Sequence, residues 1–198
     1  MKTKIYIVRH GQTSMNHAKL LQGRSDIPLN ETGILQAEKT GDYFVREGIH
    51  FDSVFSSPLQ RAIETAEAIV KDTCSVKTDE RLLEMDYGPY EGISLVNPPE
   101  EITYFFSDFT NHPAPEGMEQ LDSVVKRLGD FLEEIRTSHM SGNILISTHA
   151  IAMKGALEYL SPESHGSYWS KYIGNCAVYV SELDETGFSV PHEMNTER

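Results

Sequence analysis

Three short apolar runs, separated by amphipathic helical patterns, constrain the fold of this chain more than any other feature of its sequence. The runs are rich in β-branched and aromatic residues, which is typical of buried strands. They cover residues 4–8, 51–56 and 143–148. Two further short strands are predicted over 75–79 and 177–180. This alternation predicts an α/β fold, with helices on both faces of a central sheet.

The size and composition of the chain indicate one globular domain. Its 198 residues are 39% hydrophobic and 24% charged, without a low-complexity tract. Such proportions are those of a folded domain with a sizeable core. We therefore predict a single three-layer domain over residues 1–198, built on a mostly parallel sheet.

The segment from residue 93 to residue 118 breaks this regular pattern. It holds two proline-rich pieces, Pro98-Pro99 and Pro113-Ala114-Pro115, and four aromatic residues, Tyr104, Phe105, Phe106 and Phe109. Prolines interrupt helices and strands, so the segment is expected to be irregular. We predict a cap insertion over 93–118 that influences substrate specificity. A surface excursion packed by its own aromatic residues is the alternative.

The chain is strongly acidic, with a formal net charge of −13 at pH 7. This charge argues against nucleic acid or an anionic membrane surface as a partner. No apolar run is long enough to span a membrane and no secretory segment precedes the first strand, so we expect a cytoplasmic protein. Cys74 and Cys176 lie far apart in the sequence and are expected to be free or buried thiols.

Two helix starts are predicted from capping residues. Asn30 is a suitable N-cap for a helix that ends near Gly48. Ser57 is a second N-cap candidate, with Pro58 at the first helical position. Arg61 then lies in the first turn of the second helix, where a helix N-terminus and a guanidinium together favour an anion. An ordinary surface arginine is the alternative.

Cationic and imidazole side chains stand at the carboxyl ends of the predicted strands. Arg9 and His10 follow the first strand, and His149 follows the strand over 143–148. Ligands bind at this edge of open α/β sheets, where the ends of parallel strands meet. We therefore expect these residues to converge with Arg61. For each residue alone, the alternative interpretation is an ordinary charged side chain or a hydrogen-bonded histidine in a loop.

One carboxylate in an irregular loop completes the set. Glu84 follows two leucines in the glycine- and proline-containing stretch 82–92, which indicates partial burial. A half-buried carboxylate needs a partner or must hold a proton. Glu84 is therefore either a functional acid or the salt-bridge partner of a nearby arginine.

Two arginines, two histidines and one carboxylic acid are suited to phosphoryl transfer. Arginine binds phosphate oxygens in pairs, imidazole can attack phosphorus, and a carboxylic acid can protonate the leaving oxygen. A zinc site is the competing interpretation, because histidines and acids also bind zinc. The sequence has no HExxH or CxxC spacing, and the adjacent arginines would repel a cation, so we predict no metal. It also lacks a GxxxxGK[ST] loop and a GxGxxG motif after a strand.

These residues lie within motifs that resemble those of the histidine phosphatase superfamily, the phosphoglycerate mutase-like proteins. The family signature is similar to Arg9-His10-Gly11-Gln12-Thr13 with Asn16. Further stretches match in the family's order: 21–23, 28–33, 56–62, 82–92, 115–119 and 148–149. The matches extend over most of the chain, and together they are highly specific.

The resemblance implies a role for each residue of the set. His10 would be the nucleophile that becomes phosphohistidine, and Glu84 would be the proton donor and then the base for water. The phosphate pocket would be formed by Arg9, Arg61 and His149, with Asn16 nearby. The substrate would be bordered by Gln22, Gly23 and Ala150. The family requires no metal, and we expect no cofactor.

Three positions depart from the family pattern. The family often has an aromatic residue at Met15, a second glycine at Met118 and glycine at Ala150. None of these departures removes a catalytic group, but each changes the wall of the expected pocket.

The resemblance leaves three functions to compare. A phosphatase acting on a small phosphorylated metabolite is favoured, because the chain offers little room for the long insert of glycolytic mutases. A cofactor-dependent phosphoglycerate mutase is the first alternative, and a catalytically inactive phosphate-binding module is the second. A phosphoprotein phosphatase fits less well, because an aromatic-rich cap suits small ligands. A homodimer through an exposed sheet edge is compatible with the sequence, although no feature specifies it.

Overall fold

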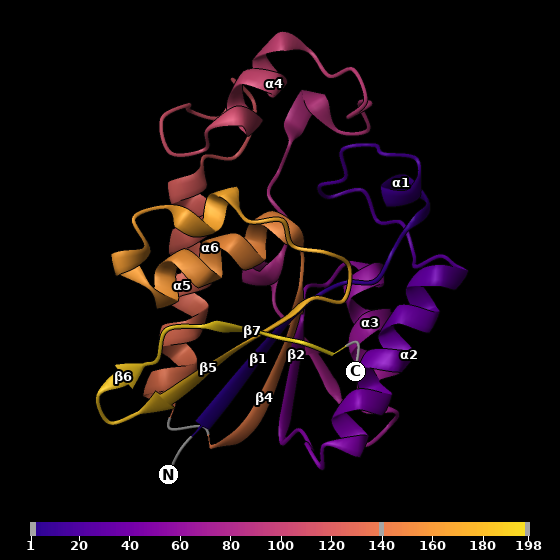
Figure 1. Ribbon diagram of the computed structural model, residues 1–198, viewed down its shortest axis with the longest axis vertical. Coiled ribbons are helices and arrows are strands. Elements are labelled where there is room, and N and C mark those ends of the chain that lie inside the picture. Colours follow the sequence, from indigo (N-terminus) through magenta and orange to yellow (C-terminus); the bar gives the residue numbers. More distant parts are fainter. Residues whose placement is uncertain (1–2, 139–140, 197–198) are drawn as a thin grey trace.

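The strands predicted from the apolar runs form one mixed sheet, which a computed structural model describes over residues 3–138 and 141–196 (Figure 1). Within these residues the strand order is β3-β2-β4-β1-β5-β6, with β7 paired to β5. The strands are β1 (Thr3–Arg9), β2 (Ser53–Ser56), β3 (Val76–Thr78), β4 (Gly142–Thr148), β5 (Val178–Asp184), β6 (Gly187–Phe188) and β7 (His192–Met194).

The helices connect these strands and cover the sheet. The α-helices are α1 (Ser14–His17), α2 (Glu31–Arg46), α3 (Gln60–Val70), α4 (Glu100–Ser107), α5 (Leu121–Thr137) and α6 (Ala150–Leu160). Four short 3₁₀ turns are also described: η1 (Glu80–Leu82), η2 (Gly88–Tyr90), η3 (Pro162–Ser164) and η4 (Ser167–Ser170).

The central part of the sheet is parallel, as predicted. β1 pairs with β4, β4 with β2, and β2 with β3, all in parallel register. β5 instead runs antiparallel to β1, and β6 and β7 pair antiparallel with β5. The parallel strands therefore end together at one edge, while the other side of the sheet is an antiparallel extension.

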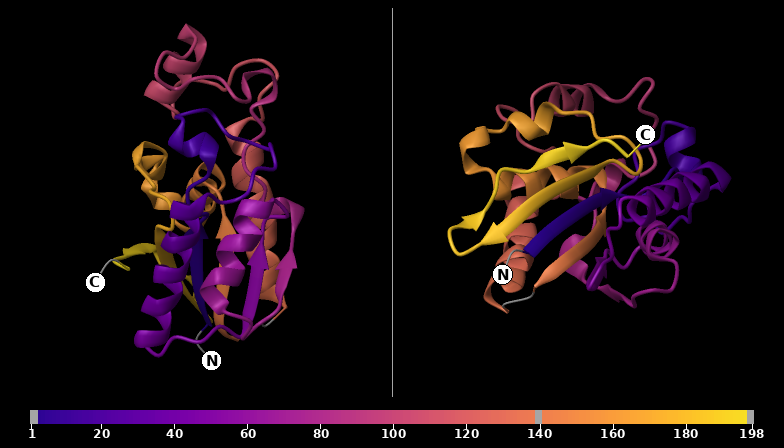
Figure 2. Two further views of the ribbon diagram at one scale, coloured as in Figure 1. Left: turned by 90° about the vertical axis from the view of Figure 1, so that its right-hand side faces the viewer. Right: turned by 60° about the horizontal axis from the view of Figure 1, so that its bottom comes forward.

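Alternating side chains of β1 explain why the domain has three layers. Ile5 and Ile7 belong to a core cluster that includes residues of α5 and α6. Tyr6 and Val8, on the opposite face, pack into a second cluster with residues of α2 and α3. Because strand side chains alternate between faces, both faces of β1 need a helical cover. Figure 2 shows the two helical layers on opposite sides of the sheet.

The first predicted helix start is confirmed and the second is wrong. The side chain of Asn30 accepts a hydrogen bond from the Gly33 amide at the start of α2. Ser57 and Pro58 precede α3, whose N-cap is Leu59. The Ser57 hydroxyl lies 2.8 Å from Nε2 of His149. The Ser57 side chain therefore makes a tertiary contact besides accepting from the Leu59 amide at 3.4 Å, and the helix begins two residues later than local preference predicts.

The segment over 93–118 contains a helix that the sequence analysis did not predict. α4 carries Phe105, which is fully buried, and the ring of Phe109 packs 4.9 Å from it, centroid to centroid. Figure 1 shows α4 at the end of the molecule toward which the parallel strands point, on the same side as α1. Buried aromatic contacts supply the stabilisation that the local sequence pattern does not reveal.

Two further expectations concern the cysteines and the membrane. Cys74 and Cys176 both carry free thiols, as expected, and Cys176 is buried. In the part of the chain that the structure describes, no helix combines the length and apolarity needed to cross a membrane.

Candidate active site

The two histidines that follow parallel strands lie side by side. Arg9 of β1 is in register with Thr148 of β4, so His10 and His149 leave the sheet at the same level. Their ring centroids are 5.1 Å apart, and both side chains are almost completely buried. The convergence expected from the strand ends is therefore present in the structure.

His10 is held as a neutral ring with one nitrogen available. Its Nδ1 lies 2.7 Å from the carbonyl oxygen of Gly11, and a carbonyl can only accept, so Nδ1 carries the hydrogen. Nε2 then has a free electron pair. Burial, together with the charges of Arg9 and Arg61, places the pKa of His10 well below its usual value. The ring is therefore uncharged at neutral pH, as a nucleophile must be.

The positively charged guanidinium of Arg61 contacts Nε2 of His10. Its Nε donates to Nε2 of His10 over 3.3 Å. Its two terminal nitrogens donate to the carbonyl oxygens of Gly23, at 2.6 Å, and Ser25, at 2.8 Å. Burial lowers the pKa of Arg61 to about 10, so the guanidinium stays charged at neutral pH although it is fully buried.

Gly23 contributes through its backbone. Its carbonyl binds Arg61, and its amide donates to both carboxylate oxygens of Glu91 at 2.9 Å. A Cβ at this position would lie 2.5 Å from a Glu91 oxygen and 2.9 Å from the Met85 carbonyl. Glycine is required here by close packing, and Glu91 is a supporting residue that the sequence analysis did not assign.

Three buried polar atoms around His10 lack a hydrogen-bond partner among the described residues: Nε of Arg9, Nε2 of Gln22 and Nδ1 of His149. Each belongs to a residue predicted for the site. The other ends of these side chains are held, for example Arg9 Nη1 by the Ile173 carbonyl at 2.6 Å. Unpaired buried polar atoms are costly unless a ligand satisfies them. Together with the two guanidinium groups, they suit an oxyanion such as phosphate.

Three side-chain amides form a connected set of hydrogen bonds beside His10. Asn16 donates to Oε1 of Gln22 at 3.3 Å, and Thr13 donates to the same oxygen at 2.6 Å. Asn175, which the sequence analysis missed, donates to the His10 carbonyl at 3.0 Å and to the Asn16 side chain at 3.3 Å. Asn175 is far from Asn16 in sequence, so no local pattern could have identified it.

Glu84 lies against the start of α6. Its carboxylate accepts hydrogen bonds from the amides of Ile151, at 3.2 Å, Ala152, at 3.0 Å, and Met85, at 2.9 Å. The side chain is only 3% exposed. The N-terminus of a helix stabilises a carboxylate, so Glu84 is held by backbone amides rather than by the salt bridge considered as an alternative.

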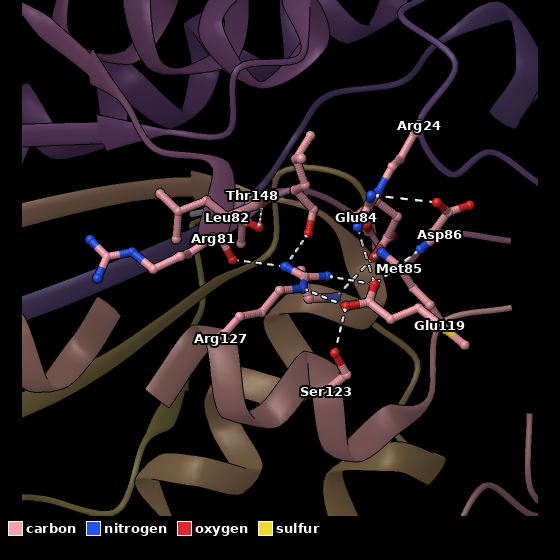
Figure 3. Close-up of polar contacts among 12 residues, drawn as sticks. Arg24, Arg81, Leu82, Glu84, Met85, Asp86, Glu119, Ser123, Arg127 and Thr148 are labelled. Carbon is pink, nitrogen blue, oxygen red and sulfur yellow. Dashed lines mark hydrogen bonds and ion pairs between the residues drawn. The ribbon is translucent and has the colours of Figure 1, made fainter. Parts of the chain in front are cut away.

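A network behind Glu84 fixes the loop that carries it (Figure 3). Arg127 of α5 donates from Nη1 to the carbonyl oxygens of Arg81, at 2.7 Å, and Leu83, at 2.6 Å. Its Nε donates to Glu119 at 2.8 Å, and Glu119 in turn accepts from the Asp86 amide at 3.1 Å. The sequence analysis assigned no role to Arg127.

Of the residues predicted for the site, all but Arg61, His149 and Gly23 line one open cavity. Its volume is about 700 Å³, and Ala150 contributes to its wall. Residues from the segment over 93–118 form much of the rest: Leu95, Pro98, Thr103, Phe106, Ser107 and Phe109. Lys154 and Tyr172 also line it, and neither was assigned from the sequence. Within residues 3–138 and 141–196, no group of three or more histidine, cysteine, aspartate or glutamate residues is arranged to hold a metal ion.

Comparisons with known proteins agree with this geometry. The family model described as "Histidine phosphatase superfamily (branch 1)" matches residues 5–196. The chain is 31% identical to "Phosphoserine phosphatase 1" of Hydrogenobacter thermophilus over 189 residues, covering 92% of this chain and 87% of that protein. It is 35% identical to "Uncharacterized phosphatase PhoE" of Bacillus subtilis over 185 residues, covering 92% and 90%.

The fold has a close counterpart among solved structures. Bacillus stearothermophilus YhfR superposes with a TM-score of 0.83 at 27% identity, covering 95% of each chain. The relatives named above support a phosphatase. The family match spans nearly all of the described sheet and every residue of the site, so the chain belongs to the histidine phosphatase superfamily.

Proposed function

We propose that this protein hydrolyses small phosphomonoesters through a phosphohistidine on His10. The observation that carries the proposal is the state of His10: its Nδ1 donates to the Gly11 carbonyl, and its unprotonated Nε2 accepts a hydrogen bond from Arg61. A neutral imidazole with one unprotonated nitrogen can attack phosphorus once a phosphoryl group takes the place of that hydrogen bond.

The first step forms a bond between Nε2 of His10 and phosphorus and breaks the bond from phosphorus to the ester oxygen. Arg9 and Arg61 neutralise charge on the transferred group. Nε2 of Gln22 donates to its oxygens, as does Nδ1 of His149 in the tautomer that carries its hydrogen there. Preorganised cations in a buried site stabilise the transition state more than they would in water.

Glu84 donates a proton to the departing oxygen in this step. For this role the Glu84 carboxyl group enters the step carrying the proton that it gives to the ester oxygen. In the second step water attacks phosphorus, Glu84 accepts the proton of that water, and the bond to His10 breaks to release inorganic phosphate.

The pocket supports a small substrate. A volume of about 700 Å³ suits a metabolite, and the aromatic wall contributed by residues 93–118 restricts access by a folded protein. The name of the phosphoserine phosphatase relative is in line with a metabolite phosphatase. Both cysteines carry free thiols, which fits the cytoplasmic location that we propose.

Intact-protein mass measured after a rapid quench without acid tests the mechanism. With p-nitrophenyl phosphate, the wild type should gain one phosphoryl group transiently, and the His10→Ala variant should not. With 3-phosphoglycerate and 2,3-bisphosphoglycerate, release of phosphate without isomerised product identifies a phosphatase. Rapid interconversion of 3- and 2-phosphoglycerate would instead identify a mutase, and binding without adduct or turnover would identify a binding module.

A further inference from the structure

One cation in the pocket has no part in the proposed phosphoryl transfer. Among the described residues that line the cavity, Arg9 and Lys154 are the two with a guanidinium or ammonium group. Arg9 belongs to the phosphate pocket. Lys154 lies on α6, one turn beyond Ala150, so its Cα is about 6 Å farther along the helix axis.

The Lys154 ammonium is held in place by two neighbours. Nζ donates to the carbonyl oxygen of Trp169 over 2.6 Å and lies 5.0 Å from the centroid of the Phe109 ring. An ammonium has three hydrogens, and one of them makes this hydrogen bond. The remaining hydrogens are available to a group that enters the cavity.

Lys154 also lacks an anionic partner within 4 Å among the described side chains, although it is only 9% exposed. Glu84, the acid on the same side of the pocket, is already bound to the amides of Ile151 and Ala152. Burial lowers the pKa of Lys154 to about 8, and the charge of Glu84 opposes that shift. A buried charge without a partner is costly, so an anion from the substrate would stabilise it.

A purely structural role for Lys154 explains less. Binding the Trp169 carbonyl needs only one uncharged donor, and a buried ammonium is an expensive way to provide it. The rest of the nearby wall is apolar, with Phe106, Phe109 and Ile151 among its residues. A cation placed in such a wall distinguishes ligands by charge, because it strengthens binding of an anion in surroundings with little water.

We propose that Lys154 binds a carboxylate of the substrate, so that the preferred substrates are small phosphomonoesters carrying a carboxylate near the phosphate. The inference rests on the proposed function, because it takes the phosphoryl group to lie at His10. It assigns the specificity of the enzyme to one residue of α6 and leaves the phosphoryl-transfer steps unchanged.

Two pairs of compounds test the proposal, because the members of each pair differ mainly in the carboxylate. They are phosphoserine with phosphoethanolamine, and 3-phosphoglycerate with glycerol 3-phosphate. The wild type should favour the carboxylate member of each pair in kcat/KM by about 10- to 100-fold, the range expected for a hydrogen bond to a charged group. A wild-type ratio near one in both pairs would overturn the proposal without any variant.

The Lys154→Gln variant retains a donor for the Trp169 carbonyl and removes the charge. It should bring both ratios close to one, mainly through KM, whereas Lys126→Gln on the exposed face of α5 should leave them at the wild-type values. Ratios unchanged by Lys154→Gln would contradict the assignment. If that variant does not fold, Lys154→Arg keeps the charge and should retain the preference.

Failure of the proposed function is recognised separately. If neither p-nitrophenyl phosphate nor any of the four compounds is hydrolysed and no phosphoenzyme forms, phosphatase activity is refuted. Calorimetric binding of 3-phosphoglycerate and glycerol 3-phosphate to His10→Ala then still measures the preference without turnover. Equal affinities would overturn the role of Lys154, and tighter binding of 3-phosphoglycerate that Lys154→Gln abolishes would support it.

Discussion

Nε of Arg61 lies 3.3 Å from Nε2 of His10, so the guanidinium contacts the nitrogen that is expected to attack phosphorus. The same side chain is fixed by the carbonyl oxygens of Gly23 and Ser25. Arg61 therefore positions the imidazole, adds to the effect of burial and of Arg9 in lowering the pKa of His10, and supplies positive charge to the transferred group. The cost of burying Arg61 is offset by these hydrogen bonds.

Replacing Arg61 by Met should lower kcat/KM by about 10²–10³, the usual effect of removing one donor from a preorganised anion site. The pKa of His10 should rise in this variant, because one of the charges that lower it is gone. The variant should therefore lose more activity between pH 7 and pH 5.5 than the wild type does. Steady-state kinetics at both pH values measure this loss of activity, and Arg136→Met on the exposed surface is the control. Parallel pH profiles of Arg61→Met and the wild type would contradict the prediction.

The loss of kcat/KM in the Glu84→Gln variant should depend on the leaving group of the substrate. General acid catalysis contributes about 10²–10⁴, so that loss is expected for an alkyl phosphate. The loss should be smaller for p-nitrophenyl phosphate, whose leaving group needs little protonation. Glutamine retains one oxygen acceptor for the α6 amides, so it disturbs the site less than alanine. Equal losses on both substrates, measured as kcat/KM, would exclude Glu84 as the acid.

Arg127 should affect activity without touching the substrate. Arg127→Met leaves the carbonyl oxygens of Arg81 and Leu83 and the carboxylate of Glu119 without their donor, which should cost about 1–3 kcal/mol of unfolding free energy. Because these contacts hold the Glu84 loop, kcat should fall more for an alkyl phosphate than for p-nitrophenyl phosphate. Urea denaturation and the two rates provide the test. Lost stability with equal falls in both rates would indicate a structural role only.

The stability of the fold should decrease below pH 6.5. Burial, with help from Arg61, lowers the pKa of both His10 and His149 well below the ordinary value. The unfolded chain binds protons at these residues near pH 6.5 while the native state does not, so unfolding is favoured as pH falls. Each histidine contributes up to about 1.4 kcal/mol per pH unit in that window. Denaturation at pH 7.5 and 5.5 should show a shallower slope for the His10→Gln, His149→Gln double variant; an unchanged slope would refute this assignment.

The sequence by itself determined the elements that depend on local pattern. The apolar run of β1, the Asn30 cap and the placement of His10 and His149 after parallel strands follow from local patterns of apolar residues and from capping chemistry. The motif resemblance added Asn16, Gln22, Gly23 and Ala150 to the predicted site and implied the role of Glu84. These features are local because each depends on neighbours a few positions away.

Only the tertiary structure decided how distant segments complete the site. Ser57 contacts His149, Phe106 of α4 packs against Tyr87, and Lys154 donates to the Trp169 carbonyl. The short apolar run of β5 also does not predict that this strand pairs antiparallel with β1. Each of these outcomes depends on free energy gained between residues far apart in the chain. A local pattern records the preference of a segment, and such long-range contacts can override it.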